Sequence, residues 1–280
     1  MPLSQIHVAE LNRTAANPLL MLHGVGRIGR DFAPLLPWLA DRHLFLWDHR
    51  GHGRSDRAAG EYLVRDYAAD VVAWLQSSRF ESVDLYGHSL GALVALRAAA
   101  EVPERVRSLI LEDPPSPSFL SGVVTSPYYY SFVAMQQLAG SSRPAETIAA
   151  ALAEVRLGPT DAAPRLGDLR DAASLRFMAR CLQEVDPAVF IPLIAGRWLD
   201  GYDFDATLTA VACPVLLLHG EVENGGMLPA DDARHIIDQL RNVTLVRFVG
   251  AGHLLHWQRL EETVRAVIGF LESLPPSSLG

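Results

Sequence analysis

A serine between two glycines stands at residues 87–91, in the order Gly87-His88-Ser89-Leu90-Gly91. The run 82–86 before it, with its apolar and β-branched residues, is typical of a buried strand, and the alanine- and leucine-rich run 92–100 after it is typical of a helix. Glycines allow the tight strand-to-helix turn that exposes a serine hydroxyl, and the helix amino end favours negative charge near that oxygen. We therefore expect Ser89 to be a nucleophile rather than an incidental serine of a turn.

A histidine, His253, directly follows the glycine turn 250–252, which ends a predicted strand over 243–249. Short strands and helices, among them a helix expected over 31–40, alternate along much of the chain. This alternation predicts right-handed crossovers and a mostly parallel sheet. Because functional residues gather at the carboxyl ends of parallel strands, we expect His253 and Ser89 to meet there. A histidine in that place can take the serine proton and give it to a leaving group, while an acid orients the imidazole.

A second glycine loop, 23–26, follows the predicted strand 18–22. Backbone N–H groups of such a loop can face a pocket and stabilise the oxyanion of an acyl-transfer intermediate. We expect the Val25 and Leu90 N–H groups to form this oxyanion hole. An ordinary glycine loop is the alternative, and His23 in this loop is interpreted as a structural histidine.

Composition limits the possible functions. The chain has 280 residues, of which 49% are hydrophobic, and a net charge of −8, which argues against binding to nucleic acid. It has no apolar run long enough to span a membrane and no basic amphipathic stretch. The N-terminal residues lack the features of a secretory signal, so a cytoplasmic location is expected. Cys181 and Cys213 have no metal-ligand spacing and are expected to be reduced, so neither a metal nor a cofactor is expected.

The alternation of strands and helices stops after Asp113. Helical patterns follow, most clearly over 144–156 and 169–184, and strand character resumes at 214–219. The predicted fold is α/β, with a mostly parallel twisted sheet of about seven or eight strands, helices on both faces and a helical cap. The core is assigned to 1–113 and 198–280 and the cap to 114–197. The apolar and aromatic content of the cap suits a lid over a pocket, although a cover for the core alone has the same composition.

The motifs, taken together, resemble those of α/β-hydrolase-fold proteins. The matching segments are 23–26, 48–56, 87–91, 213–220 and 250–253, in family order along nearly the whole chain. The resemblance implies this fold and places the cap between the sixth and seventh strands of the family sheet. Only one strand fits before Pro18, where the family has a hairpin, which leaves the presence of the first edge strand open. We interpret the charged segment 48–56 as a hydrogen-bonded loop that braces the sheet, and His88 and His256 as structural.

The resemblance also implies where the acid lies. The family pattern after the seventh strand is Gly-x-x-Asp-x-x-x-Pro, whereas here Glu223 occupies the third position after Gly220 and the proline comes late, at Pro229. Glu223 is our first choice for the acid. Glu221 in the same loop is an alternative, and so is Asp113, because some family members carry the acid at the end of the preceding strand.

The resulting hypothesis is a serine hydrolase that cleaves an ester through an acyl-enzyme, with Ser89, His253 and Glu223 as its triad. The expected partner is a small acyl substrate with an apolar portion. Hydrolysis of a carbon–carbon bond or of a lactone could use the same triad. A ligand-binding protein with weak turnover is the alternative from another class, and the irregular acid loop motivates it.

Overall fold

The computed structural model describes residues 5–58 and 60–275. Within these ranges one sheet has the strand order β1-β3-β2-β4-β5-β6-β7. The first strand runs antiparallel to β3 and every other neighbouring pair is parallel, which confirms the predicted sheet. The strands are β1 (Val8–Leu11), β2 (Asn17–Leu22), β3 (Arg42–Trp47), β4 (Val83–His88), β5 (Val106–Glu112), β6 (Val215–Gly220) and β7 (Val243–Phe248). Within residues 5–16, β1 is the single strand, so the family's edge hairpin is absent there.

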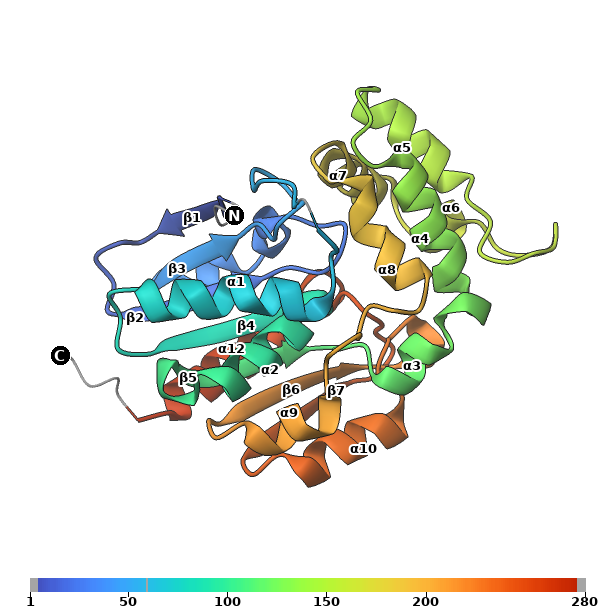
Figure 1. Ribbon diagram of the computed structural model, residues 1–280. Helices are drawn as coiled ribbons and strands as arrows, with labels where there is room; N and C mark the ends of the chain where they lie inside the picture. Colours follow the sequence, from blue (N-terminus) through green and yellow to red (C-terminus); the bar gives the residue numbers. More distant parts are fainter. Residues whose placement is uncertain (1–4, 59, 276–280) are drawn as a thin grey trace.

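Helices cover both faces of the sheet (Figure 1). One face packs against α1 (Val64–Ser77), α2 (Leu90–Glu101), α9 (Phe204–Ala210) and α10 (Ala230–Gln239). The other face packs against α11 (Leu255–Gln258) and α12 (Leu260–Ser273). In β2, Leu20 and Leu22 face the first layer, whereas Leu19 and Met21 face the second. This alternation explains why a strand buried on both faces reads as a continuous apolar run.

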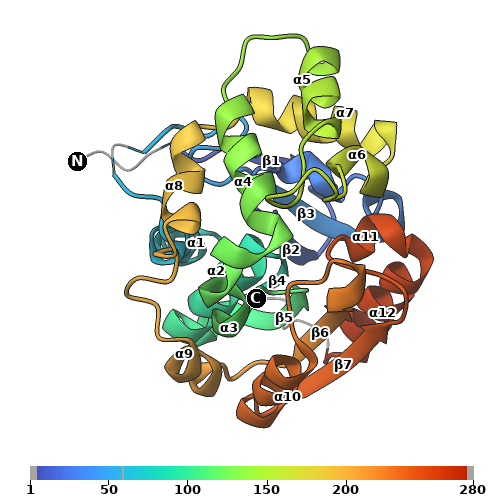
Figure 2. The same cartoon turned by 90° about the vertical axis from the view of Figure 1, so that its right-hand side faces the viewer.

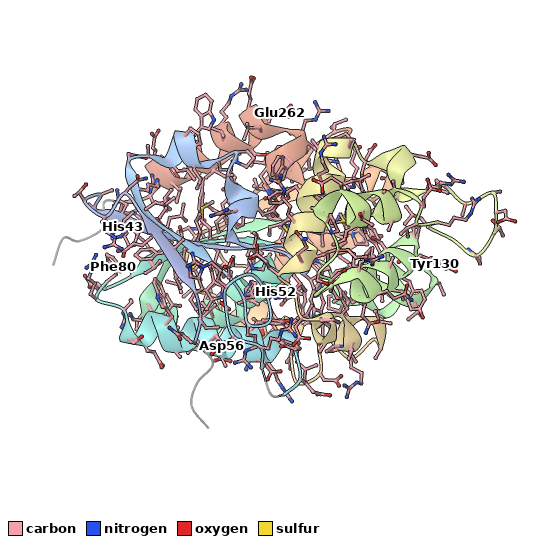
Figure 3. The ribbon with its side chains drawn as sticks, turned by 90° about the horizontal axis from the view of Figure 1, so that it is seen from above. His43, His52, Asp56, Phe80, Tyr130 and Glu262 are labelled. Carbon is pink, nitrogen blue, oxygen red and sulfur yellow. The ribbon has the colours of Figure 1, made fainter. Side chains whose placement is uncertain are left out.

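Of the α-helices between β5 and β6, all except α9 lie beyond the carboxyl ends of the strands (Figures 1 and 2). They are α3 (Pro117–Ser121), α4 (Pro127–Leu138), α5 (Ala145–Ala153), α6 (Leu166–Leu169), α7 (Ala172–Gln183) and α8 (Ile191–Ile194). In Figure 3, Tyr130 of α4 marks this end of the molecule, and His43 and Phe80, at the amino ends of strands, mark the opposite end. The predicted helices over 144–156 and 169–184 are present with shorter bounds. The domain boundaries at 113 and 197 stay a prediction.

One helix predicted from the sequence is wrong. In place of a helix over 31–40, the chain forms two short 3₁₀ turns, Gly29–Phe32 and Leu36–Leu39. Pro34 and Pro37 have no N–H to donate, which prevents a continuous α-helix through this segment. Within the described ranges, no helix combines the length and the apolar character needed to span a membrane.

Gly91 marks a close approach between α2 and β2. A Cβ atom at this position would lie 1.9 Å from the carbonyl oxygen of Leu22, and neither backbone can move away cheaply. We expect Gly91→Ala to lower the free energy of unfolding by about 3 kcal/mol, at the upper end of the range for overpacked cores. Gly269→Ala is the matched control, because a Cβ there meets nothing within 4 Å on an exposed part of α12.

The control substitution should raise the free energy of unfolding by up to about 1 kcal/mol, because alanine is the better helix former. Urea unfolding of the two variants beside the wild type measures both effects. Equal stability of the Gly91 and Gly269 variants would contradict the close approach.

Candidate active site

Ser89 stands at the turn between β4 and α2. Its backbone angles are φ 55° and ψ −116°, a region that non-glycine residues rarely adopt. Gly87 lets the turn close, because a Cβ atom there would lie 2.2 Å from the carbonyl oxygen of Gly91. The Ser89 N–H donates to the Glu112 carbonyl oxygen at 3.0 Å, which ties the turn to the end of β5. The predicted strand–serine–helix turn is therefore present, with the side chain on the wall of a cavity.

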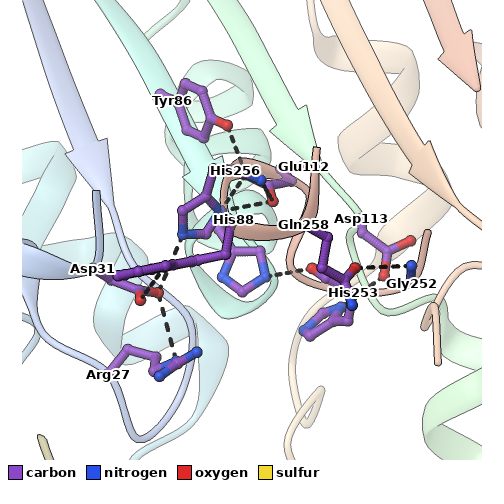
Figure 4. Close-up of polar contacts among 11 residues, drawn as sticks. Arg27, Asp31, Tyr86, His88, Glu112, Asp113, Gly252, His253, His256 and Gln258 are labelled. Carbon is purple, nitrogen blue, oxygen red and sulfur yellow. Dashed lines mark hydrogen bonds and ion pairs between the residues drawn. The ribbon is translucent and has the colours of Figure 1, made fainter. Parts of the chain in front are cut away.

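His253 meets an aspartate in the interior. Its Nδ1 lies 2.6 Å from Oδ2 of Asp113, whose side chain is fully buried (Figure 4). The same carboxylate oxygen accepts the Met227 N–H at 2.8 Å. Asp113 follows β5 directly, and its φ of 43° turns the side chain out of the strand direction. With Nδ1 occupied, Nε2 is the ring nitrogen that remains to exchange a proton with the serine.

This geometry favours Asp113 over Glu223, our first choice of acid. Glu223 belongs to the 3₁₀ turn Val222–Asn224, where its side chain is exposed and lines the cavity. Glu221 instead accepts from the Gly250 N–H and from Asn224 Nδ2, both at 2.8 Å, and so stabilises the turn before His253. The long loop after β6 brings the Met227 backbone amide to the Asp113 carboxylate, which contacts the imidazole. The late proline, Pro229, was the sequence signal that this loop departs from the family pattern.

The loop after β2 packs directly on the serine turn. A Cβ atom at Gly24 would lie 3.0 Å from Nδ1 of His88 and 3.2 Å from Cβ of Ser89. Two of the loop amides are already used, since the Gly26 N–H donates to His52 Nε2 and the Arg27 N–H donates to the Gly24 carbonyl oxygen. Within the described part of the chain, the Val25 and Leu90 N–H groups have no protein acceptor. These two are the amides expected for an oxyanion hole.

The cavity beside Ser89 has a volume of about 570 Å³ and lies between the sheet and the cap. Ser89, His253 and Val25 line it from the core, while α4, α6 and α7 line it from the other side. Most of the remaining lining is apolar, and it includes Phe119, Tyr128, Phe132, Met135, Leu166 and Met178. Helices α4, α6 and α7 therefore line a pocket at the ends of the strands.

The family follows from a comparison with known proteins. The model of the alpha/beta hydrolase fold family matches residues 17–260. The chain belongs to this family. The putative carbamate hydrolase RutD of Pseudomonas syringae pv. syringae is 29% identical over 93% of this hydrolase and 95% of the relative. The RutD of Azorhizobium caulinodans is 35% identical, but the match spans 35% of this chain and 37% of that protein. The crystal structure of E-2-(acetamidomethylene)succinate hydrolase is 25% identical with a TM-score of 0.73, covering 96% of both chains.

A buried ion cluster lies beside His88 in this hydrolase (Figure 4). Glu112 accepts from the Tyr86 hydroxyl at 2.6 Å, and its other oxygen lies 2.7 Å from Nδ1 of His256. On the opposite side of the ring, Nε2 of His256 lies 3.5 Å from Oδ2 of Asp31, which in turn lies 3.6 Å from Nε of Arg27. The cluster of Arg27, Asp31, His256 and Glu112 holds the segment after His253 against β5, which fits the structural role predicted for His256.

The charges of this cluster balance. Burial opposes the charge of His256, but the Glu112 and Asp31 carboxylates raise its pKa to about 9. Burial also opposes the charge of Glu112, yet His256 lowers the pKa of that carboxyl to about 2. Despite its own burial, Asp31 has a pKa well below the usual value because of Arg27 and His256. Two cations and two anions therefore face each other near neutral pH.

His88 lies against the catalytic histidine candidate without adding charge. Its Nε2 is 2.9 Å from the His253 carbonyl oxygen, and the two rings are 4.6 Å apart between centroids. Burial lowers the pKa of His88 to about 3, so the ring is neutral and its Nε2–H donates to that oxygen. A neutral neighbour does not oppose a positive charge on His253.

Three more buried histidines connect the 48–56 loop to the glycine loop. His49 donates its N–H to His23 Nε2 at 3.1 Å, and its own Nε2 contacts the His23 carbonyl oxygen at 3.1 Å. His52 Nε2 accepts the Gly26 N–H, also at 3.1 Å. Arg50 forms an ion pair with Asp70 of α1. The 48–56 loop is therefore a hydrogen-bonded brace as predicted, although histidines make the contacts to the glycine loop.

This brace should weaken in acid. Burial lowers the pKa of His52 from 6.5 to about 3, so below pH 6.5 the unfolded chain binds a proton that the folded chain refuses. The stability from neutral His52 is complete above pH 6.5 and is lost as the pH falls toward 3, by about 1.4 kcal/mol per pH unit. Between pH 6.5 and 5.5, the wild type should lose about 1 kcal/mol more free energy of unfolding than His52→Gln.

Urea unfolding at the two pH values measures this difference. His235→Gln removes an exposed histidine and should keep the wild-type pH dependence. The same pH dependence of the free energy of unfolding in His52→Gln and in the wild type would contradict this prediction.

Proposed function

We propose that the protein is a serine hydrolase that cleaves an ester of a small carboxylic acid through an acyl-enzyme, with Ser89, His253 and Asp113 as its triad. The observation that carries the proposal is the 2.6 Å contact between His253 Nδ1 and the buried Asp113 carboxylate, at the edge of the cavity that Ser89 lines. The nucleophile Ser89, the base His253 and the acid Asp113, which orients the base, then all lie at the carboxyl ends of the strands.

Acylation begins when the Ser89 oxygen attacks the carbonyl carbon of the ester and His253 Nε2 takes the hydroxyl proton. Asp113 stabilises the imidazolium that results. The Val25 and Leu90 N–H groups stabilise the negative charge on the former carbonyl oxygen. Among the described residues neither group has a protein acceptor, and Leu90 stands at the amino end of α2, which favours negative charge. His253 then protonates the departing alcohol, and the acyl group stays on Ser89.

Deacylation repeats these steps with water in place of the serine hydroxyl. His253 takes a proton from the water, the resulting hydroxide attacks the acyl carbon, and the proton returns to the Ser89 oxygen as the acid leaves. The neutral state of His88 supports this proposal, because a second positive ring beside His253 would oppose the charge that forms twice in each cycle.

A panel of p-nitrophenyl esters with acyl chains from C2 to C12 tests the proposal. The cavity of about 570 Å³ supports an optimum at short or medium chains, with Phe132, Met135 and Met178 against the apolar portion. Turnover by the wild type that is absent from Ser89→Ala would support an esterase and measure the acyl pocket. Turnover that is equal in the two proteins would contradict the role of Ser89.

Hydrolysis of a carbamate or an amide is the second candidate. It is favoured by the match with a putative carbamate hydrolase over 93% of this chain. For an amide, the chemistry differs only in the leaving group, an amine in place of an alcohol, which His253 would also protonate. In a carbamate, a heteroatom also replaces the acyl chain on the carbonyl carbon. Turnover of the p-nitroanilide of the best acyl chain, or of a methyl N-alkylcarbamate of similar length, at a rate above that of the esters, would favour this candidate.

A further inference from the structure

Two arginines line the same cavity as Ser89. Arg27 follows the glycine loop in the core, and Arg170 lies in the cap between α6 and α7. The other ionisable side chains on the cavity wall, apart from tyrosine, are Glu223, which is exposed, and the histidines His88 and His253. A cavity wall that is otherwise mostly apolar thus carries two guanidinium groups, although the whole chain has a net charge of −8.

The Arg27 side chain is held in place, but not all of its N–H donors have an acceptor. Its residue is 5% exposed, its Nε lies 3.6 Å from Asp31 Oδ2, and its guanidinium carbon lies 5.5 Å from the centre of the Phe177 ring. Its Nη1 is buried and, in the part of the chain that the structure describes, has no hydrogen-bond partner. A buried donor without an acceptor is costly, so the Asp31 contact alone does not satisfy this guanidinium.

Arg170 adds a positive charge that lies outside the buried ion cluster of Arg27, Asp31, His256 and Glu112. Arg27 and His256 are offset by Asp31 and Glu112, whereas no carboxylate of the described residues forms an ion pair with Arg170. Burial, together with the charge of Arg27, lowers the pKa of Arg170, so the two guanidiniums repel each other across the cavity. The cavity wall therefore carries two guanidiniums against one carboxylate, that of the exposed Glu223, which suits a negatively charged group on the ligand.

We propose that Arg27 and Arg170 together bind a carboxylate of the substrate, so that the hydrolysed compound carries a second, ionised carboxyl group beside an apolar chain. The planar fork of a guanidinium matches a carboxylate, and the contact with Asp31 fixes the direction of the Arg27 side chain. The inference rests on the proposed function in one respect, that the bound molecule is an acyl substrate of Ser89.

Kinetics with a matched pair of esters tests the proposal. Monomethyl adipate and methyl hexanoate have the same six-carbon acyl chain, but the first ends in a carboxylate and the second in a methyl group. We expect kcat/KM of the wild type to be about 10- to 100-fold higher for the anionic ester, the scale of a hydrogen-bonded charge pair. Arg170→Gln should lower this ratio by about tenfold or more, mainly through KM for the anion.

The matched control for the cap arginine is Arg176→Gln, an exposed arginine of α7, which should keep the wild-type ratio. Arg27→Gln should also lower the ratio, and its partner control is the exposed Arg30→Gln. Because Arg27 belongs to the buried ion cluster, the ratio of Arg27→Gln is measured only if this variant folds. If it does not fold, Arg170→Gln alone tests the proposal. A ratio near one in the wild type, or an unchanged ratio in Arg170→Gln, would overturn the proposal.

A binding measurement separates this proposal from the proposed function. Calorimetric titration of Ser89→Ala with adipate, and with its neutral diamide as the reference, needs no turnover. Binding of adipate but not of the diamide, weakened about tenfold or more by adding Arg170→Gln, supports the carboxylate site even if no ester is hydrolysed. Equal affinity for adipate and the diamide would overturn the site even if Ser89 is the nucleophile of an esterase.

Discussion

Replacement of Asp113 by asparagine should lower kcat for the best ester by about 10⁴-fold, the scale seen when the acid of a serine triad is neutralised. The amide is neutral and cannot stabilise a positive charge on His253. The buried Met227 N–H would still find the amide oxygen as an acceptor, so the fold should tolerate the change. Steady-state kinetics with a p-nitrophenyl ester measures the loss.

Glu223→Gln is the matched control for this prediction. Glu223 was the acid expected from the sequence, and its side chain is exposed at the cavity, so its neutralisation should change kcat by no more than about twofold. A large loss in Glu223→Gln together with near wild-type activity in Asp113→Asn would return the acid to the loop after β6.

Replacement of Ser89 by alanine should have the largest effect, a fall in kcat of about 10⁶-fold, because acylation has no other nucleophile. Ser89→Gly should lose the same activity. It should also be the more stable of the two variants, because glycine adopts a φ of 55° without strain whereas alanine does not.

Ser121→Ala removes an exposed serine of α3 and should keep wild-type kinetics. Kinetics and urea unfolding of all three variants test both halves of the prediction. Residual activity of Ser89→Ala within a few hundred-fold of the wild type would contradict the nucleophilic role.

The sequence predicts the parts of the fold whose signals are local. The glycines at 87 and 91 predict the serine turn because only glycine permits the approach of Gly91 to Leu22. The apolar runs predict the parallel strands, and their order predicts that Ser89 and His253 lie at the same edge. The helix expected over 31–40 fails because two prolines interrupt a pattern that is otherwise apolar and helical in period.

The sequence narrows the triad acid to Glu223, Glu221 and Asp113 but does not decide among them. The choice depends on how the loop after β6 folds back, which places the Met227 amide on the Asp113 carboxylate and leaves the Glu223 side chain exposed. The pairing of Arg27 with Arg170 has no sequence signal, because one lies in the core and the other in the cap. Only the packing of these two parts brings both guanidiniums to one cavity.

The most direct test of the central claim is covalent labelling with a fluorophosphonate probe, followed by mass mapping of the tryptic peptides. The account predicts a single stoichiometric label on Ser89, within the peptide 80–97. The label should form more slowly by orders of magnitude in His253→Ala and in Asp113→Asn, and at the wild-type rate in Glu223→Gln. Absence of a label on Ser89 in the folded wild type, or labelling at the same rate in His253→Ala, would contradict a serine hydrolase built on this triad.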